Sequence, residues 1–303
     1  RGCGGRGGGV LRRGGVGLFI ATLLARTFQP TMMPAFQRYT SMFAANASAH
    51  GQMAYYRALE QAGHLRWIKD AATLDKHVAA WKTGTSTDPL GFILSMEGAD
   101  PVLSPEEVHD WFAAGLRIIG PAHYGPSPYS HGTGTIGGLF PQGKPLLREM
   151  EQVGMILDIT HLADQAMDEA FEIYGGPLLA SHHNCRVLVD DQRQLRDSDI
   201  KKLVARGGVI GAAFDAWMLA PGWVRGKSQP KEANVTISTV IDHIDHVCQL
   251  AGNAKHAAIG TDHRHRGLPA ERRIGEHHTV AIARVSDERI NSLHLHSDFG
   301  TNR

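Results

Sequence analysis

The sequence of 303 residues predicts an α/β fold with a parallel sheet, most economically a single (β/α)8 barrel of the TIM type. Three observations support this prediction. Apolar runs of strand length recur along the chain, and their hydrophobicity is continuous, as in strands buried on both faces. Segments with helical spacing alternate with these runs. Two consecutive runs also end at a histidine, which places both imidazoles at the same edge of a parallel sheet.

The apolar runs and the segments between them define the predicted elements in chain order. The predicted strands are Val16–Ala25, Phe92–Met96, Leu116–Gly120, Met155–Ile159, Leu178–Ala180, Val209–Ala213 and Ala257–Ile259. The predicted helices are Ala49–Ala62, Thr73–Lys82, Pro105–Ala114, Lys144–Val153, Asp164–Tyr174, Asp197–Arg206 and Ser238–Ala251. Ser104, followed by proline and two glutamates, marks one helix start. A closed barrel needs eight strands, so these seven predict a barrel that lacks one.

The clearest single unit is Gly154–Cys185. Its two apolar runs end at His161 and His182, and the stretch between them has helical spacing and stops at a glycine pair. Strand, helix and strand make a βαβ unit, and two histidines at the mouth of its sheet are typical of metal sites in α/β barrels. The alternative, a doubly wound open sheet, favours a GxGxxG turn after the first strand, and none stands there.

A long segment rich in glycine, proline and serine, Tyr124–Gly138, directly follows a predicted strand. Loops in that position of a barrel commonly face the substrate. We therefore expect this loop to lie over the site.

Composition excludes several classes of partner. Lysine plus arginine (31) nearly balances aspartate plus glutamate (30), so the sequence predicts binding to neither nucleic acid nor an anionic membrane. Three unevenly spaced cysteines form neither a disulfide framework nor a zinc knuckle, which favours a reducing, cytoplasmic setting. The 18 histidines raise the expectation of metal chemistry.

The arginine-rich and glycine-rich start of the chain resembles a secretion signal, but it is too short and too rich in glycine to span a membrane. We interpret Val16–Leu24 as a buried strand. Because the chain begins at Arg1 and not at methionine, we do not expect this to be the natural start. We predict a barrel over residues 1–262, incomplete at its N-terminus, and a divergent tail over residues 263–303.

Chemically capable side chains follow the predicted strands. They are Glu97, His123, His161, His182 and Asp262, with Arg193 in the loop after His182. A carboxylate directly after a buried strand is costly to ionise unless it is paired or bound to a metal. This set suits a binuclear zinc hydrolase, in which a carboxylate bridges two ions, imidazoles complete the coordination and an arginine grips a substrate carboxylate.

Several segments resemble the membrane dipeptidase (renal dipeptidase-like) family of zinc peptidases, most closely its bacterial branch. They are RRGGVGLFIATLLAR, ILSMEGAD, GLRIIGPAHYG, ILDITHL, ASHHNC with DDQRQLRDSDI, GGVIGAAFDAWMLAPGWVRG and HIDHVCQLAGNAKHAAIGTD. They run in family order from about Arg12 to Asp262.

The resemblance implies two zinc ions per site and a role for each candidate residue. Glu97 would be the bridging ligand, and His161 and His182 would bind the second zinc. His123 would contact the substrate carbonyl and Arg193 the substrate carboxylate, although the family usually has Arg-Asn where this chain has Arg193-Gln194. Asp262 would be the proton shuttle.

The sequence departs from the family pattern in two places. The family's first strand ends in a His-x-Asp pair that binds the other zinc, and no such pair precedes the RGGVG segment here. The missing strand and the missing ligands are therefore one loss. After Asp262 the family's Asp-Gly-Gly loop is absent, and we interpret the tail as frameshifted, which resequencing of the coding DNA would test. His263-x-His265 resembles a strand-end metal pair, but we attribute it to composition.

We expect a zinc-dependent dipeptidase, whose activity the missing ligands can impair. One alternative is another amide or lactone hydrolase of the amidohydrolase type, with Asp215–Gly226 reshaping the pocket. The other is a non-catalytic remnant that binds one zinc or none. An open barrel exposes a parallel edge, so we also expect marginal solubility unless a second subunit forms a homodimer over that edge.

Overall fold

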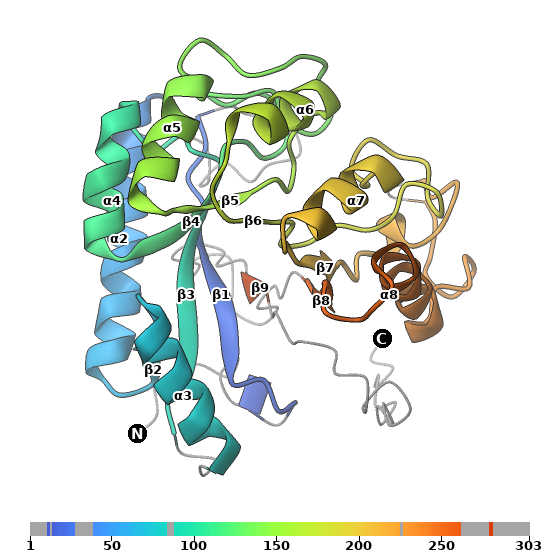
Figure 1. The fold of residues 1–303 in the computed structure, drawn as a ribbon, viewed down its shortest axis with the longest axis horizontal. Helices are drawn as coiled ribbons and strands as arrows, with labels where there is room; N and C mark the ends of the chain where they lie inside the picture. Colours follow the sequence, from blue (N-terminus) through green and yellow to red (C-terminus); the bar gives the residue numbers. More distant parts are fainter. Residues whose placement is uncertain are drawn as a thin grey trace.

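The structure is a computed structural model that describes residues 11–12, 14–27, 39–83, 88–224, 227–261 and 279–280. Strands and helices alternate along the chain (Figure 1). The strands are β1 (Leu18–Leu23), β2 (Leu65–Trp67), β3 (Leu90–Glu97), β4 (Leu116–Gly120), β5 (Ile156–Asp158), β6 (Leu178–Leu179), β7 (Ile210–Ala212), β8 (Ala257–Ile259) and β9 (Thr279–Val280). The α-helices are α2 (Met42–Gln61), α3 (Ala71–Thr83), α4 (Val108–Ala114), α5 (Gly143–Val153), α6 (Asp164–Ile173), α7 (Asp197–Ala205) and α8 (Ile237–Ala251). Two short 3-10 helices are η2 (Pro105–Glu107) and η3 (Ala216–Met218).

All seven predicted strands are present, and they pair in parallel. β1 pairs with β3 from Leu18↔Gly91 to Leu23↔Met96. The sheet continues in chain order through β4, β5 and β6, each strand parallel to the one before. A single bridge, Ala180↔Ile210, joins this sheet to the parallel pair β7 and β8. The prediction of a parallel α/β fold is confirmed.

The free edge of β1 carries a short strand that the sequence analysis did not predict. β9 pairs with it antiparallel, at Ile20↔Val280 and Ala21↔Thr279. Within the described residues β8 and β1 do not pair, so these two strands do not close the barrel. The predicted tail, residues 263–303, lies outside the described residues except for β9.

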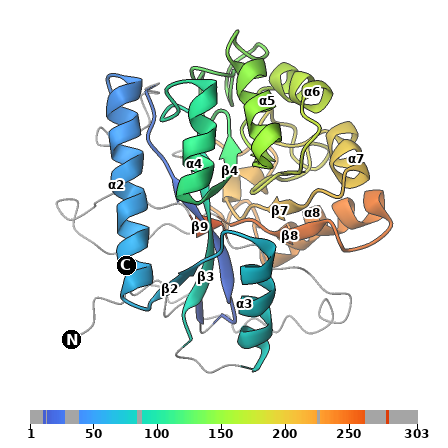
Figure 2. The ribbon, with the colours of Figure 1, turned by 60° about the vertical axis from the view of Figure 1, so that its left-hand side comes forward.

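The seven predicted helices are also present, and they lie outside the sheet (Figures 1 and 2). α4 and α5 pack on β4 and β5, while α8 packs on β7 and β8. The largest difference from the prediction is α2, which begins at Met42 and not at Ala49. Ser41 caps it, since its hydroxyl accepts a hydrogen bond from the Ala44 N–H at 3.2 Å.

The two faces of the sheet are chemically different. Residues such as Phe19, Ala21 and Leu23 face the helices and belong to the large apolar core. The opposite face of the strands carries a small apolar cluster of Ile20, Ile93, Ile118, Ile156 and Leu179. Because side chains alternate along a strand, the next residues on this inner face are Thr22 and Ser95, whose hydroxyl oxygens lie 3.4 Å apart. The interior therefore becomes polar toward the carboxyl ends of the strands.

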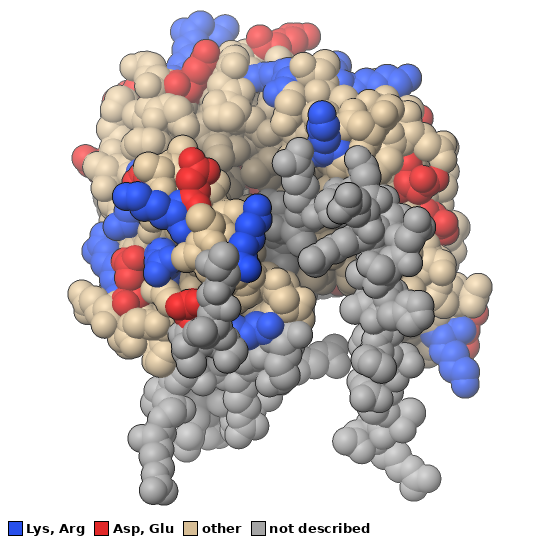
Figure 3. All heavy atoms as spheres, turned by 60° about the horizontal axis from the view of Figure 1, so that its bottom comes forward, with Lys and Arg blue, Asp and Glu red and all other residues tan. Residues whose placement is uncertain are grey.

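The apolar N-terminal segment is a strand, as interpreted from sequence, because Val16–Leu24 contains the largely buried β1. No helix in the described ranges has the length and apolar character needed to cross a membrane. Neither Cys185 nor Cys248 is in a disulfide. Basic and acidic side chains are interspersed on the face in Figure 3, in line with the balanced composition.

Candidate metal centre

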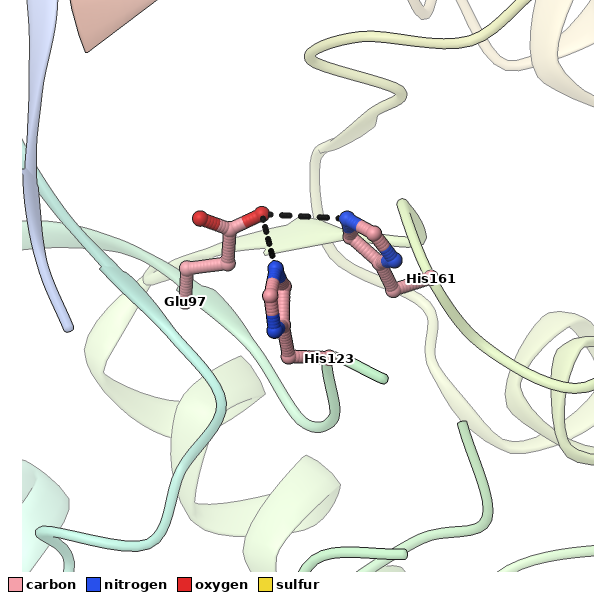
Figure 4. A group of neighbouring side chains, drawn as sticks. All are labelled: Glu97, His123 and His161. Atoms are coloured by element: carbon pink, nitrogen blue, oxygen red, sulfur yellow. Dashed lines mark ion pairs between the residues drawn. The ribbon is translucent and has the colours of Figure 1, made fainter. Parts of the chain in front are cut away.

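Four of the sequence-predicted site residues meet at the carboxyl edge of the sheet. Glu97 is the last residue of β3, and His123, His161 and His182 follow β4, β5 and β6. The strands are parallel and in register, with Glu97 opposite Gly120, so their ends bring these side chains to one place. Figure 4 shows one carboxylate oxygen of Glu97 facing the rings of His123 and His161.

The distances within this cluster are short. Glu97 Oε1 lies 3.2 Å from His161 Nε2, 3.3 Å from His182 Nε2 and 3.6 Å from His123 Nε2. The two nitrogens His161 Nε2 and His182 Nε2 are 3.2 Å apart. All four residues are buried, with exposed fractions between 2% and 7%.

Burial and neighbouring charges set the protonation of the cluster. Burial raises the pKa of Glu97, but the imidazoles of His123, His161 and His182 outweigh it and hold that pKa well below the usual range. Burial lowers the pKa of His161 well below its ordinary value, and the nearby Arg193 and His123 add to this. At neutral pH Glu97 is therefore an anion and His161 is neutral.

These side chains fit a divalent cation. Glu97 Oε1 is buried and has no aligned hydrogen-bond donor among the described residues. A carboxylate oxygen facing the nitrogens of buried imidazoles at 3.2–3.6 Å is an electron-rich arrangement that a cation between them would stabilise. Ligand atoms of Glu97, His123 and His161 all lie within 4.8 Å of one another, and His182 Nε2 adjoins them. Imidazole nitrogen with carboxylate oxygen is a typical donor set for zinc.

Hydroxyl groups occupy the far side of two imidazoles. Thr133 Oγ1 lies 3.0 Å from His161 Nδ1, and Ser181 Oγ lies 2.9 Å from His182 Nδ1. The Nε2 atoms of both rings are thus left facing Glu97. Sequence reasoning missed both hydroxyls, although Thr133 belongs to the loop Tyr124–Gly138 that it expected over the site, and Ser181 directly precedes His182.

The backbone behind the histidines is held by side chains. Asp158 Oδ1 accepts hydrogen bonds from the N–H groups of Thr160 at 3.0 Å and Ser181 at 3.1 Å, which join the ends of β5 and β6. His161 has a φ of 68°, a left-handed conformation that is uncommon for a residue with a side chain. Its N–H donates to His183 Nε2 at 3.4 Å.

Arg193 reaches the same cluster from the loop after β6. Arg193 is 1% exposed, and its Nη2 donates to the His182 carbonyl at 2.8 Å and lies 3.2 Å from His161 Nε2. Nε and Nη1 have no hydrogen-bond partner within the described ranges. The adjacent Gln194 is structural, since its side chain bonds the backbone of Asn184 and Met218.

Asp262, the predicted proton shuttle, lies outside the described residues, three positions after the end of β8. His263 and His265 lie outside them as well. Only the part of the site built on β3 to β6 is therefore placed.

Comparison with known proteins gives concordant matches. The family model "Membrane dipeptidase (Peptidase family M19)" matches residues 24–272. An uncharacterized dipeptidase of Schizosaccharomyces pombe is 26% identical over 195 residues, covering 63% of this chain and 46% of that protein. Dipeptidase tcpJ of Claviceps purpurea is 32% identical over 125 residues, covering 41% of this chain and 27% of that protein. The chain thus spans about half or less of the length of these curated relatives.

Solved structures share the fold. The dipeptidase AC, a metallopeptidase of family M19, superimposes with a TM-score of 0.68 at 22% identity, covering 86% of this chain and 76% of that one. A metallopeptidase from Rhodobacter sphaeroides, liganded with a phosphinate mimic of the dipeptide L-Ala-D-Ala, gives 0.64 at 24% identity, covering 73% and 62%. The family model covers most of the chain, and the chain therefore belongs to the membrane dipeptidase family, peptidase family M19.

Proposed function

We propose that this chain is a zinc-dependent dipeptidase, which hydrolyses the peptide bond of a dipeptide bearing a free C-terminal carboxylate. The observation that carries the proposal is the convergence of Glu97 Oε1 with three imidazole nitrogens at 3.2–3.6 Å. Family membership supports the reaction class. The dipeptide mimic bound by the Rhodobacter sphaeroides relative supports the substrate class.

Glu97, His161 and His182 would hold the metal. When bound, zinc would lower the pKa of a water molecule to about 7 and polarise the substrate carbonyl. The family resemblance implies two ions per site. The side chains placed here gather around one carboxylate oxygen, so the number of ions bound is a property to measure.

The remaining residues would bind the substrate and move its proton. Arg193 would grip the C-terminal carboxylate, because two nitrogens of its buried guanidinium have no protein partner within the described residues. His123 would contact the substrate carbonyl, as its Nε2 faces the cluster at 3.6 Å from Glu97. Asp262 would carry a proton to the leaving amine, a role proposed from the family resemblance alone.

The test combines metal content with turnover. Zinc-loaded protein is assayed on a panel of L-L and L-D dipeptides, and bound zinc is counted by mass spectrometry. Glu97→Gln keeps the shape of the side chain and removes its charge, so we expect zinc affinity and turnover to fall by about 100-fold or more. Glu172→Gln, on the exposed face of α6, is the matched control and should change neither.

Each alternative has its own result. Zinc at one ion or none per chain, with no turnover of any dipeptide, would identify a non-catalytic remnant. Turnover of simple amides or lactones without turnover of dipeptides would identify another amidohydrolase-type enzyme. Either result would reject the dipeptidase assignment.

We also propose a reducing, cytoplasmic setting. Cys185 is buried and Cys248 is partly buried, and neither is in a disulfide. A disulfide involving either one in protein isolated from its native host would contradict this.

A further inference from the structure

We infer that Thr133 is a positioning residue, whose hydroxyl holds His161 in the tautomer that keeps the lone pair on Nε2, the ring nitrogen beside Glu97 Oε1. The consequence for metal affinity rests on the proposed metal-dependent function. The tautomer itself follows from hydrogen bonds within the chain.

The Thr133 hydroxyl contacts both ends of His161. Its Oγ1 lies 3.3 Å from the carbonyl oxygen of His161 and 3.0 Å from the ring nitrogen Nδ1. A carbonyl oxygen can only accept, so the hydroxyl proton goes to it. The lone pair of Oγ1 is then left to accept a proton from Nδ1–H. Neutral His161 therefore carries its ring proton on Nδ1 and keeps the lone pair on Nε2.

Arg193 supports the same tautomer independently. Its Nη2 lies 3.2 Å from His161 Nε2. A guanidinium donates hydrogen bonds and accepts none, so Nε2 must be the accepting nitrogen of the ring. Glu97 Oε1 also lies 3.2 Å from His161 Nε2, but it is not aligned to accept a hydrogen bond from that nitrogen. The aligned contacts on the two sides of the imidazole therefore agree on a proton at Nδ1.

The local backbone explains why His161 needs this support. Its left-handed conformation, with a φ of 68°, departs from the strand that precedes it. Two contacts fix the residue, the Thr133 hydroxyl on its carbonyl and His183 on its N–H. A ring on such a turn would otherwise be free to present either nitrogen to Glu97.

Thr133 is itself held firmly by the loop that carries it. Its N–H donates to the His123 carbonyl at 3.0 Å, and its carbonyl accepts from the Gly125 N–H at 2.8 Å. The Gln192 side chain accepts from the Gly134 N–H at 2.7 Å and donates to the Thr135 carbonyl at 2.8 Å. These hydrogen bonds hold the loop next to Arg193 and fix the backbone of Thr133. The short Thr133 side chain then leaves its hydroxyl little freedom to move.

The test compares three variants in the metal-free protein. Thr133→Val keeps the shape of the side chain and removes the hydroxyl, while Thr133→Ser keeps the hydroxyl. Thr135→Val is the matched control, because its hydroxyl belongs to the same loop but bonds the Gly132 carbonyl. Imidazole ¹⁵N chemical shifts report the tautomer of His161, and competition with a chelator reports zinc affinity.

Wild type, Thr133→Ser and Thr135→Val should show His161 with its proton on Nδ1. Thr133→Val should show a mixture of tautomers and a zinc affinity lower by about 10-fold to 100-fold, the usual effect of removing a hydrogen-bond partner of a metal ligand. Wild-type His161 with its proton on Nε2 would overturn the inference. So would an unchanged tautomer in Thr133→Val.

The design separates this inference from the proposed function. The ¹⁵N measurement needs neither metal nor turnover, so a wild-type protein that binds no zinc would reject the metallopeptidase and still decide the role of Thr133. If Thr133→Val does not fold, as judged by circular dichroism, the wild-type tautomer alone supports or overturns the inference. Thr133→Ala then provides a smaller variant without the hydroxyl.

Discussion

The two sheets of the molecule contribute differently to the site. The sheet of β1, β3, β4, β5 and β6 carries the placed candidate ligands at its carboxyl edge. The pair β7 and β8 meets this sheet through glycines, since Gly211 and Gly260 both lie against the Ser181 carbonyl. The sheet of β1, β3, β4, β5 and β6 supplies the functional side chains. The pair β7 and β8 brings its backbone close to Ser181, the residue before His182.

This difference shows how a parallel sheet builds a cluster. Successive strands in register bring one side chain each to a common edge, so neighbours in chain order become neighbours in space. The glycine contacts do the opposite, because they bring main chain to main chain where a side chain would not fit. We therefore expect substitutions that change a buried charge to destabilise the sheet of β1 to β6. Substitutions that add a side chain should destabilise the contact of Gly211 and Gly260 with Ser181, which we call the joint.

In the sheet of β1 to β6, we expect the largest loss of stability from a substitution at Asp100, just beyond the end of β3. Its carboxylate lies 2.7 Å from Arg26 Nε and accepts from the N–H and hydroxyl of Thr27. Both charged side chains are fully buried, and Arg26 also donates to the Pro126 carbonyl at 2.9 Å. Asp100→Asn leaves the guanidinium without its counterion, and we expect a loss of about 3–5 kcal/mol in the free energy of unfolding by urea titration.

A control separates charge from shape at this position. The double variant Arg26→Met with Asp100→Asn removes both charges and should recover part of the loss. Equal stability of Asp100→Asn and wild type would mean that the pair contributes little.

The joint between the two regions is tested by Gly211→Ala. A Cβ on Gly211 would lie 2.1 Å from the Ser181 carbonyl and 2.7 Å from Gly260 Cα, so backbone must move. We expect a loss of about 1–3 kcal/mol in the free energy of unfolding and a weaker zinc affinity, because Ser181 adjoins His182. Gly51→Ala, in the exposed part of α2 with no atom within 4 Å of the new Cβ, should instead stabilise by about 0.5–1 kcal/mol. A Gly211→Ala variant as stable as wild type would refute the steric argument.

The smallest expected effect lies on the outer surface, where Arg186 donates to both carboxylate oxygens of Asp164 at 2.7 and 2.8 Å. Its hydrogen bonds, against some burial, lower the pKa of Asp164. Because the pKa of Asp164 is lower in the folded protein than in the unfolded chain, the carboxylate stabilises the fold at pH values above the unfolded pKa, about 3.9. This stabilisation is lost as the pH falls through the folded-state pKa. Since the carboxylate is 36% exposed, we expect Asp164→Asn to lose less than about 1 kcal/mol at pH 7. Urea titrations at pH 7 and pH 3 should show a smaller difference at the lower pH, and a constant difference would contradict the ion pair as its source.

The strands were predictable because they are buried on both faces, and continuous apolar runs such as Val209–Ala213 mark them without help from tertiary context. β2 was missed because three residues, one of them Arg66, are too few to show a period. The start of α2 was predicted too late because the buried residues of its first half, Ala45 and Ala49, have small side chains. They give only a weak periodic pattern of hydrophobicity. Both errors lie in segments where the sequence shows little hydrophobic periodicity.

The site follows the same rule. Glu97 and the histidines were predictable because they end apolar runs, and the sheet carries them to one edge. Thr133 was not, since its contact with His161 spans 28 residues and depends on how a loop folds back. No periodicity reports such a contact.

The left-handed backbone of His161 has a consequence for engineering. Histidine in this conformation is less stable by about 1–2 kcal/mol than glycine, and asparagine also tolerates it better. A library screened for thermal tolerance alone would therefore favour glycine or asparagine at position 161 and discard a metal-ligating side chain. Selection for catalysis and selection for robustness pull this position in opposite directions.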